Sequence, residues 1–384
     1  MRKGLFIYPW DIIDNGLDRV AKELQQIQVN SVSLAVAYHQ AKVLLPHNPK
    51  RRIYVHKGGC CYFPFKSSDY GCLKPKTGEL LENYSGDFLR DAVIGFHKEN
   101  IEVDAWAVVF HNSRLAGSHP ECAIHNAYGE PSPSSLCPSN DETFRYGLKI
   151  LADIAAAGVD AINTESVDFA GLLHGDHHEM YAYENVAMME KLLGICFCDS
   201  CIKRAIDAGV DAKELQRKVI SKTERFLKLE PIDFSEIQGQ LENYQALQLG
   251  RITEFYTELR NRIALSKLTT RIVPILWLVG GSNPRQYGMD MERIGELTDG
   301  FIAAYPDSPA KVAEFTAVSR KMVPNNKEII GGIRLMAPHT VKSSQVKEYM
   351  NAYRKNGIDK VLFYNYGLAP QPFLNEIRED ACNG

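Results

Sequence analysis

Eight short apolar runs alternate with helical stretches along the whole chain, and this alternation limits the possible folds more than any other feature. The predicted strands are residues 5–9, 31–37, 103–110, 161–164, 271–278, 300–305, 329–333 and 360–364. Between them, helices are predicted at 16–27, 87–99, 142–157, 250–265, 291–297, 309–323 and 343–356. Repeated strand–helix units build a parallel sheet covered by helices. Eight units that end near the C-terminus predict an α/β fold, a closed (β/α)8 or TIM barrel rather than an open sheet.

Three connections that follow strands are too long to be ordinary loops: 38–86, 111–141 and 165–242. In a barrel they lie at the C-terminal face, where active sites form. The third has its own predicted helices at 184–193 and 212–229. Because no repeat or low-complexity linker marks a second domain, we expect one barrel over 1–384, and the 165–242 excursion carries a cysteine cluster.

Charge and hydropathy exclude several classes of protein. Lys and Arg total 44 and Asp and Glu 47, so the net charge is −3, and no concentrated basic face is expected. Nucleic acid and membrane are therefore not expected as partners. A cytoplasmic location is expected, because the apolar run after the basic start is cut short at Asp11, as a first strand and not a signal peptide would be.

All three tryptophans fall in or just after predicted strands, at Trp10, Trp106 and Trp277. Flat aromatic rings on a pocket floor suit stacking against the C–H faces of sugar rings. The alternative is that they only fill the top of the barrel core. Because all three tryptophans share this position, we favour the pocket interpretation.

Glu165 follows the fourth strand and should point into the barrel mouth, where partial burial can raise the pKa of a general acid. The alternative is a salt-bridged structural carboxylate. Nearby, His177 and His178 belong to a polar cluster at 174–179. In a helix, His174 and His178 would share a face as two metal ligands do; in a loop, the cluster would bind substrate hydroxyls or merely be solvated.

Cys196, Cys198 and Cys201 form a C-x-C-x-x-C motif, and tetrahedral zinc needs a fourth ligand, for which we choose Cys137. Four thiolates make a closed, structural zinc site with no open position for substrate. The alternative is that these cysteines are small buried apolar residues. No organic cofactor is expected.

The Cys-Pro-Ser-Asn stretch at 137–140, the strand-4 glutamate and the C-x-C-x-x-C loop resemble the zinc-bearing β-galactosidases of glycoside hydrolase family forty-two. The resemblance spans about 136–201. It implies that Cys137 and the three loop cysteines hold a structural zinc and that Glu165 is the catalytic acid/base. A weaker resemblance, at 38–39 and 45–49, is to uncharacterised glycosidase-like barrel proteins.

The sequence departs from that family in two places. The family has Asn directly before the acid/base, whereas Thr164 intervenes here. Retaining members carry a nucleophilic glutamate at the end of strand 7, where this chain has Arg334 and no carboxylate. A second carboxylate is generally needed, so we predict Asp307 as nucleophile or base, followed by Asp168 and Asp11. Arg334 could instead hold the carboxylate of an acidic sugar.

The sequence therefore predicts a glycosidase acting on a carbohydrate, with a homo-oligomer as one option for its assembly. Residues predicted to bind substrate are Trp10, His39, Trp106, His111, Asp168, His177, His178, Trp277, Arg334 and Tyr364. One alternative is a divalent-metal-dependent sugar isomerase, epimerase or lyase, with His39, His111 and Glu165 among the ligands. Another is a carbohydrate-binding barrel without catalysis.

Overall fold

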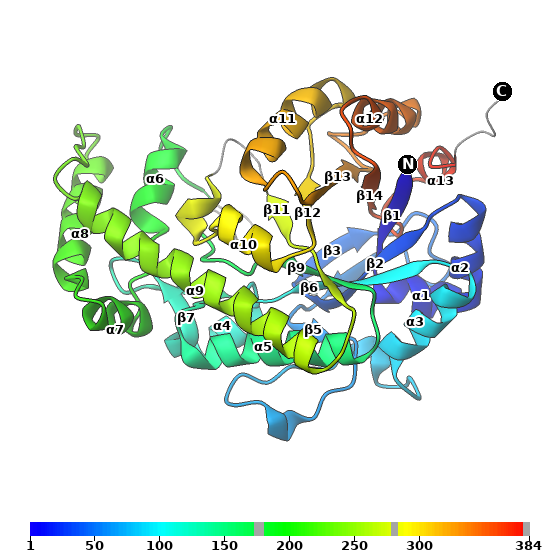
Figure 1. Cartoon of the computed structure of the whole chain (residues 1–384), viewed down its shortest axis with the longest axis horizontal. Helices are drawn as coiled ribbons and strands as arrows, with labels where there is room; N and C mark the ends of the chain where they lie inside the picture. Colours follow the sequence, from blue (N-terminus) through cyan, green and yellow to red (C-terminus); the bar gives the residue numbers. More distant parts are fainter. Residues whose placement is uncertain (173–179, 278–282, 379–384) are drawn as a thin grey trace.

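The eight predicted strands form a closed parallel barrel in the computed structural model, which describes residues 1–172, 180–277 and 283–378 (Figure 1). The barrel strands are β1 (Arg2–Ile7), β2 (Ser31–Tyr38), β6 (Glu102–Val108), β9 (Ala161–Glu165), β10 (Arg271–Ile272), β11 (Ile275–Trp277), β12 (Gly300–Ala304), β13 (Glu328–Arg334) and β14 (Lys360–Tyr364). They pair in the order β10-β9-β6-β2-β1-β14-β13-β12-β11. The predicted fold class is confirmed.

The fifth strand is divided, whereas a single strand at 271–278 is predicted. Its first part, β10, pairs with β9, and its second part, β11, pairs with β12. Pro274 lies between them and has no N–H to donate to a ladder. Its carbonyl accepts from Ile302 N–H at 2.9 Å, and Val273 N–H donates to Ile162 O at 2.9 Å. The two parts together close the ring.

Each strand is buried on both faces, which is why it reads as an almost continuous apolar run. Phe6 of β1 belongs to a cluster inside the barrel, whereas its neighbours Leu5 and Ile7 pack into the layer between strands and helices. At the start of the strands, Lys360 Nζ lies 3.5 Å from Asp104 Oδ2, and both side chains are 3% exposed. This end of the barrel is therefore closed around a buried ion pair.

The outer helices are α2 (Leu17–Gln26), α3 (Phe88–Lys98), α5 (Asp141–Ala156), α9 (Gln238–Leu265), α10 (Met291–Leu297), α11 (Val312–Met322), α12 (Ser344–Lys355) and α13 (Gln371–Asn375). Helix α9 begins twelve residues before its predicted start, at 250. The first strand ends earlier than predicted, because Pro9 begins α1 (Pro9–Asn15). The buried Asp11 caps this helix by accepting the Tyr8 N–H at 2.9 Å.

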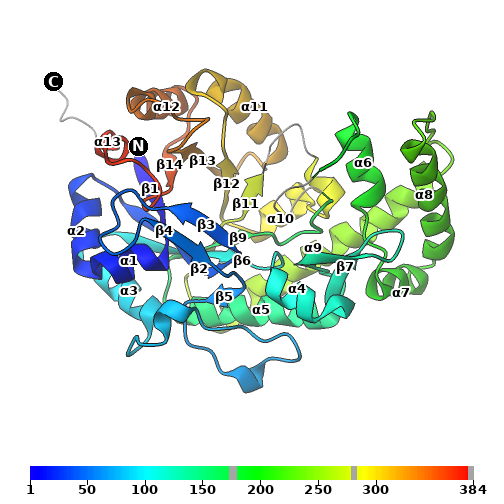
Figure 2. The ribbon, with the colours of Figure 1, turned by 180° about the vertical axis from the view of Figure 1, so that it is seen from behind.

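The three excursions all extend from the carboxyl ends of their strands. The first contains the hairpin β3 (Ala41–Leu44) and β4 (Ile53–His56), followed by β5 (Cys60–Cys61). The second contains α4 (Ser113–Ser118) and the hairpin β7 (Ala123–His125) and β8 (Pro131–Leu136). The third contains α6 (Val186–Leu193), α7 (Asp199–Asp207) and α8 (Ala212–Leu227), which gather at the end of the molecule far from the N-terminus (Figures 1 and 2).

Candidate active site in the barrel mouth

Glu165, the last residue of β9, is 4% exposed and sits where the barrel opens. Trp106 of the neighbouring strand β6 donates its Nε1–H to Glu165 Oε2 at 2.5 Å. The indole therefore fixes the direction of the carboxyl group. Its ring packs against Phe6 at 4.8 Å and Tyr38 at 4.7 Å between centroids, so Trp106 forms part of an aromatic floor beneath the mouth.

Three tyrosine hydroxyls are linked beside this floor. Tyr8 Oη lies 3.0 Å from Tyr38 Oη and 2.8 Å from Tyr364 Oη. Burial raises the pKa of all three phenols, and the charge of Glu165 raises the pKa of Tyr38 and Tyr364 further. They remain neutral at ordinary pH and can both donate and accept hydrogen bonds.

Arg334, the last residue of β13, is held by an aromatic ring and a histidine. Its guanidinium carbon lies 4.7 Å from the centroid of Tyr305 and 5.9 Å from that of Tyr364. Arg334 NH1 donates to His339 Nε2 at 3.3 Å, which leaves the proton of a neutral His339 on Nδ1, 3.2 Å from Pro306 O. A cation thus occupies the strand-7 position at the mouth.

Of the three candidates for a second carboxylate, Asp11 is the buried cap of α1, and the other two differ in their surroundings. Asp168 is partly buried; burial, and then the charge of Glu165, raise its pKa to about 7. The chain turns back between the two acids at Ser166, whose φ is +53°. Asp307 follows β12 and is exposed. Asp168 is therefore the acid that responds electrostatically to Glu165.

Other predicted residues lie around this centre. The His39 ring stacks on Tyr38 at 4.2 Å and lies 5.3 Å from that of His111, and burial lowers the pKa of His39. Trp10 lies in α1 instead of at a strand end; it is fully buried and its ring is 4.3 Å from that of Tyr8. The predicted residues His174, His177 and His178 and the Trp277 side chain lie outside the described residues.

Sequence reasoning did not include Tyr8, Tyr38 and Tyr305 among the site residues. Each lies at the end of a barrel strand or one residue beyond it. Their position is therefore the signal that could have identified them. Nothing in the local sequence shows that the Tyr8 ring lies 5.2 Å from that of Tyr38, or the Tyr305 ring 5.8 Å from that of Tyr364, because these residues come from different strands.

The four cysteines of the predicted metal site lie together, and all four are buried. Their Sγ atoms all lie within 4.8 Å of one another. Cys137 Sγ lies 3.5 Å from Cys201 Sγ, 3.5 Å from Cys198 Sγ and 3.7 Å from Cys196 Sγ. This cluster could bind a metal ion. It joins the segment between β8 and α5 to the segment between α6 and α7, and Tyr244 Oη supports it by donating to Cys196 O at 2.7 Å.

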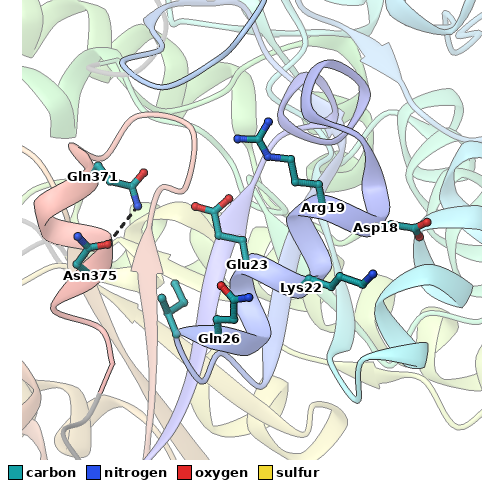
Figure 3. A pocket seen from close by; sticks show the side chains of 8 residues that line it. Asp18, Arg19, Lys22, Glu23, Gln26, Gln371 and Asn375 are labelled. Atoms are coloured by element: carbon teal, nitrogen blue, oxygen red, sulfur yellow. Dashed lines mark hydrogen bonds between the residues drawn. The ribbon is translucent and has the colours of Figure 1, made fainter.

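A groove of about 680 Å³ lies away from the mouth, between outer helices (Figure 3). Its polar lining comes from α2 and α13 and includes Asp18, Arg19, Lys22, Glu23, Gln371 and Asn375. Side chains of both charges lie there on one face of α2. We assign no chemistry to this groove.

The strand order defines a (β/α)8 barrel, and its mouth holds a carboxyl group among aromatic rings. Glycosidases of known structure have the same barrel fold. Solved structures with this fold include the α-L-fucosidase isoenzyme 2 from Paenibacillus thiaminolyticus, with a TM-score of 0.61 and 12% identity over 98% of this chain and 48% of that one. A β-galactosidase from the psychrophilic Marinomonas ef1 gives a TM-score of 0.58 and 11% identity over 98% and 58%. The β-galactosidase from Halorubrum lacusprofundi gives 0.56 and 12% over 98% and 57%.

The likeness to these enzymes is one of fold alone, because the identities are so low. The chain spans about half to three-fifths of the length of each of them. No protein-family model and no curated protein matches it. Among the described residues, no helix is long and apolar enough to cross a membrane.

Proposed function

We propose that the protein is a glycoside hydrolase in which Glu165 is the general acid/base. The observation that carries this proposal is the carboxyl group of Glu165, buried at the carboxyl end of β9 and oriented by Trp106. A low-polarity site can keep such a group protonated until it donates to a leaving oxygen. The fold neighbours, an α-L-fucosidase and two β-galactosidases, support the same reaction class.

The second carboxylate is either Asp307, as the sequence predicts, or Asp168. Glycoside hydrolysis generally uses two carboxyl groups, one to protonate the leaving group and one to act as nucleophile or base. Asp168, whose pKa burial and the charge of Glu165 raise to about 7, can lose its proton near neutral pH and then act as nucleophile or base. The resemblance to family forty-two supports the role of Glu165 but supplies no strand-7 nucleophile, because Arg334 stands there.

The test compares hydrolysis of a panel of aryl glycosides by the wild type and by Glu165→Gln, Asp168→Asn and Asp307→Asn. The matched control is Glu292→Gln, an exposed position on α10. Loss of turnover by about 10³-fold or more in Glu165→Gln, with the control unchanged, is expected for a catalytic acid. The aspartate variant that added azide rescues with formation of a glycosyl azide of inverted anomeric configuration identifies the nucleophile. Full activity of Glu165→Gln would refute the proposal.

The same assays separate the alternative functions. Sugar binding without turnover, in both the wild type and Glu165→Gln, would identify a binding barrel. Interconversion of free sugars that stops on chelation would identify a metal-dependent isomerase or epimerase. Product release with a new hydroxyl on the sugar, unaffected by mild chelation, is the outcome that the hydrolase proposal requires.

We also propose that the four-cysteine cluster holds zinc. Four thiolates about 2.3 Å from a tetrahedral zinc lie about 3.8 Å from one another, and the distances from Cys137 to its three neighbours, 3.5–3.7 Å, fit that arrangement. A bound ion would supply folding energy and no catalysis, since four protein ligands leave no open position. Metal analysis of the purified protein tests this, and about one zinc per chain is expected.

Arg334 is the residue that we propose to hold the carboxylate of an acidic sugar. A guanidinium over an aromatic ring at the mouth can form a bidentate pair with such a group. Arg334→Ala should weaken the binding of an acidic monosaccharide glycoside and leave a neutral one unaffected. Unchanged affinity for the acidic glycoside would refute this assignment.

A further inference from the structure

Two cysteines outside the metal cluster lie side by side, although they belong to different excursions. Cys72 is in the first excursion, and Cys122 ends a short 3-10 helix, Pro120–Cys122, in the second. Their thiols are hydrogen-bonded to each other. Cys72 is exposed, whereas Cys122 is buried, with 2% of its surface exposed. The pair therefore joins a sulfur that solvent reaches to one that solvent does not reach.

The segment that carries Cys72 is held in place on both sides of that residue. Gly71 lies so close to the first turn of α5 that a Cβ there would be 2.0 Å from Glu142 Oε2. On the other side, Lys74 O accepts from Arg114 Nη2 of α4 at 2.7 Å. Both Glu142 and Arg114 lie beyond the first excursion. These contacts keep the Cys72 segment against the second excursion and the helix that follows it.

Backbone hydrogen bonds fix the position of Cys122. Its N–H donates to His119 O at 2.9 Å, and its carbonyl accepts from Cys137 N–H at 2.8 Å and from Thr143 Oγ1 at 3.4 Å. Thr143 follows directly after the glutamate that contacts Gly71, so one helical turn supports both segments. Because the Cys72 side chain is exposed, it can rotate toward the fixed Cys122 without displacing a packed neighbour.

The other described cysteines are not suited to form a disulfide. Cys60 and Cys61 are consecutive in β5 and both are buried. Successive side chains of a strand point to opposite faces, so these two sulfurs face apart. The four remaining described cysteines gather as the candidate metal ligands. Among the described cysteines, Cys72 and Cys122 are therefore the pair that an oxidant can join.

We propose that Cys72 and Cys122 form a reversible disulfide when a peroxide reaches Cys72. In a reducing compartment both residues stay thiols, and disulfides found there are usually transient or redox-sensing. The proposal does not depend on the glycosidase function. It assigns a modification site to two residues at the junction between two excursions, away from the carboxyl groups of the mouth.

The reaction has two balanced steps. The Cys72 thiolate attacks one oxygen of hydrogen peroxide, the O–O bond breaks, and Cys72 becomes a sulfenic acid as hydroxide leaves. The Cys122 sulfur then attacks the sulfenic sulfur, the S–O bond breaks, and the hydroxyl group leaves with the thiol proton as water. In sum, two thiols and one peroxide give one disulfide and two waters. A small dithiol such as dithiothreitol returns the two electrons.

The disulfide would connect positions that are 50 residues apart in the sequence, from 72 to 122. A cross-link of this length restricts the unfolded chain and so stabilises the folded one, provided that it does not strain the native geometry. It would also end one hydrogen bond away from the metal cluster, since the Cys122 carbonyl accepts from Cys137. The metal ligands themselves take no part in the reaction.

The experiment treats the reduced full-length protein with one to two equivalents of hydrogen peroxide and follows it by intact mass and peptide mapping. The variants are Cys72→Ser and Cys122→Ser. The matched control is Cys60→Ser, which removes a thiol from the first excursion outside the pair. Circular dichroism confirms folding, and because Cys72 is exposed, Cys72→Ser keeps the test available if Cys122→Ser is unstable.

The wild type and Cys60→Ser are expected to lose about 2 Da, the mass of two hydrogen atoms, and to regain it with dithiothreitol. Mapping should find residues 72 and 122 in one linked peptide. Cys72→Ser should show no such loss, and Cys122→Ser should instead hold a sulfenic acid at Cys72 that dimedone traps. Oxidation should raise Tm by roughly 2–5 °C in the wild type and not in Cys72→Ser.

Several results would overturn the proposal. One is a Cys72 sulfenic or sulfinic acid in the wild type while Cys122 remains a free thiol. Others are a disulfide between two chains, which a non-reducing gel detects, or an equal mass loss in Cys72→Ser. Metal content is measured in the same samples. Loss of metal in step with the mass change would show that the cluster cysteines are oxidised in place of this pair.

Discussion

Asp11 gives the sharpest test of how burial controls charge in this protein. Its side chain caps α1 through the Tyr8 N–H and is 1% exposed. Burial is the main cause that raises its pKa from 3.8 to about 8. Between those values the unfolded carboxyl is ionised while the folded one keeps its proton, so the folded state binds one proton more. Stability from this group therefore falls by about 1.4 kcal/mol for each unit that the pH rises.

Asp11→Asn keeps the shape of the protonated carboxyl and an oxygen for the Tyr8 N–H, but it has no proton to lose. From pH 5 to pH 7 the free energy of unfolding of the variant should therefore rise by about 2.7 kcal/mol relative to that of the wild type. Urea unfolding at pH 5, 6 and 7 measures this difference. In the control, Asp207→Asn, where the side chain is 60% exposed, the difference should vary by less than about 0.5 kcal/mol. A constant difference for Asp11→Asn would show that the buried acid is charged and would refute the reasoning.

Three further substitutions test other parts of the molecule. Trp106→Phe removes the hydrogen bond to the proposed acid and should lower kcat for glycoside hydrolysis by about 10- to 100-fold; an unchanged kcat would contradict the role of the indole. Lys360→Met leaves Asp104 buried without its nearest cation and should cost about 3–5 kcal/mol in urea unfolding, most of which the double variant with Asp104→Asn should regain. Cys137→Ser should reduce the metal content from about one ion per chain to none and lower Tm; retention of the metal would show that this sulfur is not a ligand.

The barrel could be predicted from sequence because its strands are buried on both faces and its helices on one, so that the two elements differ in hydrophobic period. The beginning of α9 could not, because its first turns contain Gly239 and few apolar residues, and their helical state depends on packing against the excursion. The division of the fifth strand has a visible cause in Pro274. Its two ladders nevertheless depend on the neighbours that the closed ring provides.

Part of the candidate site could likewise be predicted from the sequence, and part could not. Glu165 and the cysteines could be selected because each belongs to a short local pattern. The link between Tyr8, Tyr38 and Tyr364 joins the first two strands to the last, with Tyr364 356 positions from Tyr8, and only closure of the barrel brings it to them.

The divided fifth strand makes the barrel unequal around its circumference. The β9–β10 ladder covers two residue pairs, at the amino-terminal half of β9, whereas β11 joins β12 through three pairs. The carboxyl-terminal half of β9, which ends in Glu165, is bonded to β6 on its other side. A substrate that spreads the mouth therefore meets least backbone resistance between the fourth and fifth strands. A change in the width of the opening there would change the distance between the proposed acid and the fifth strand.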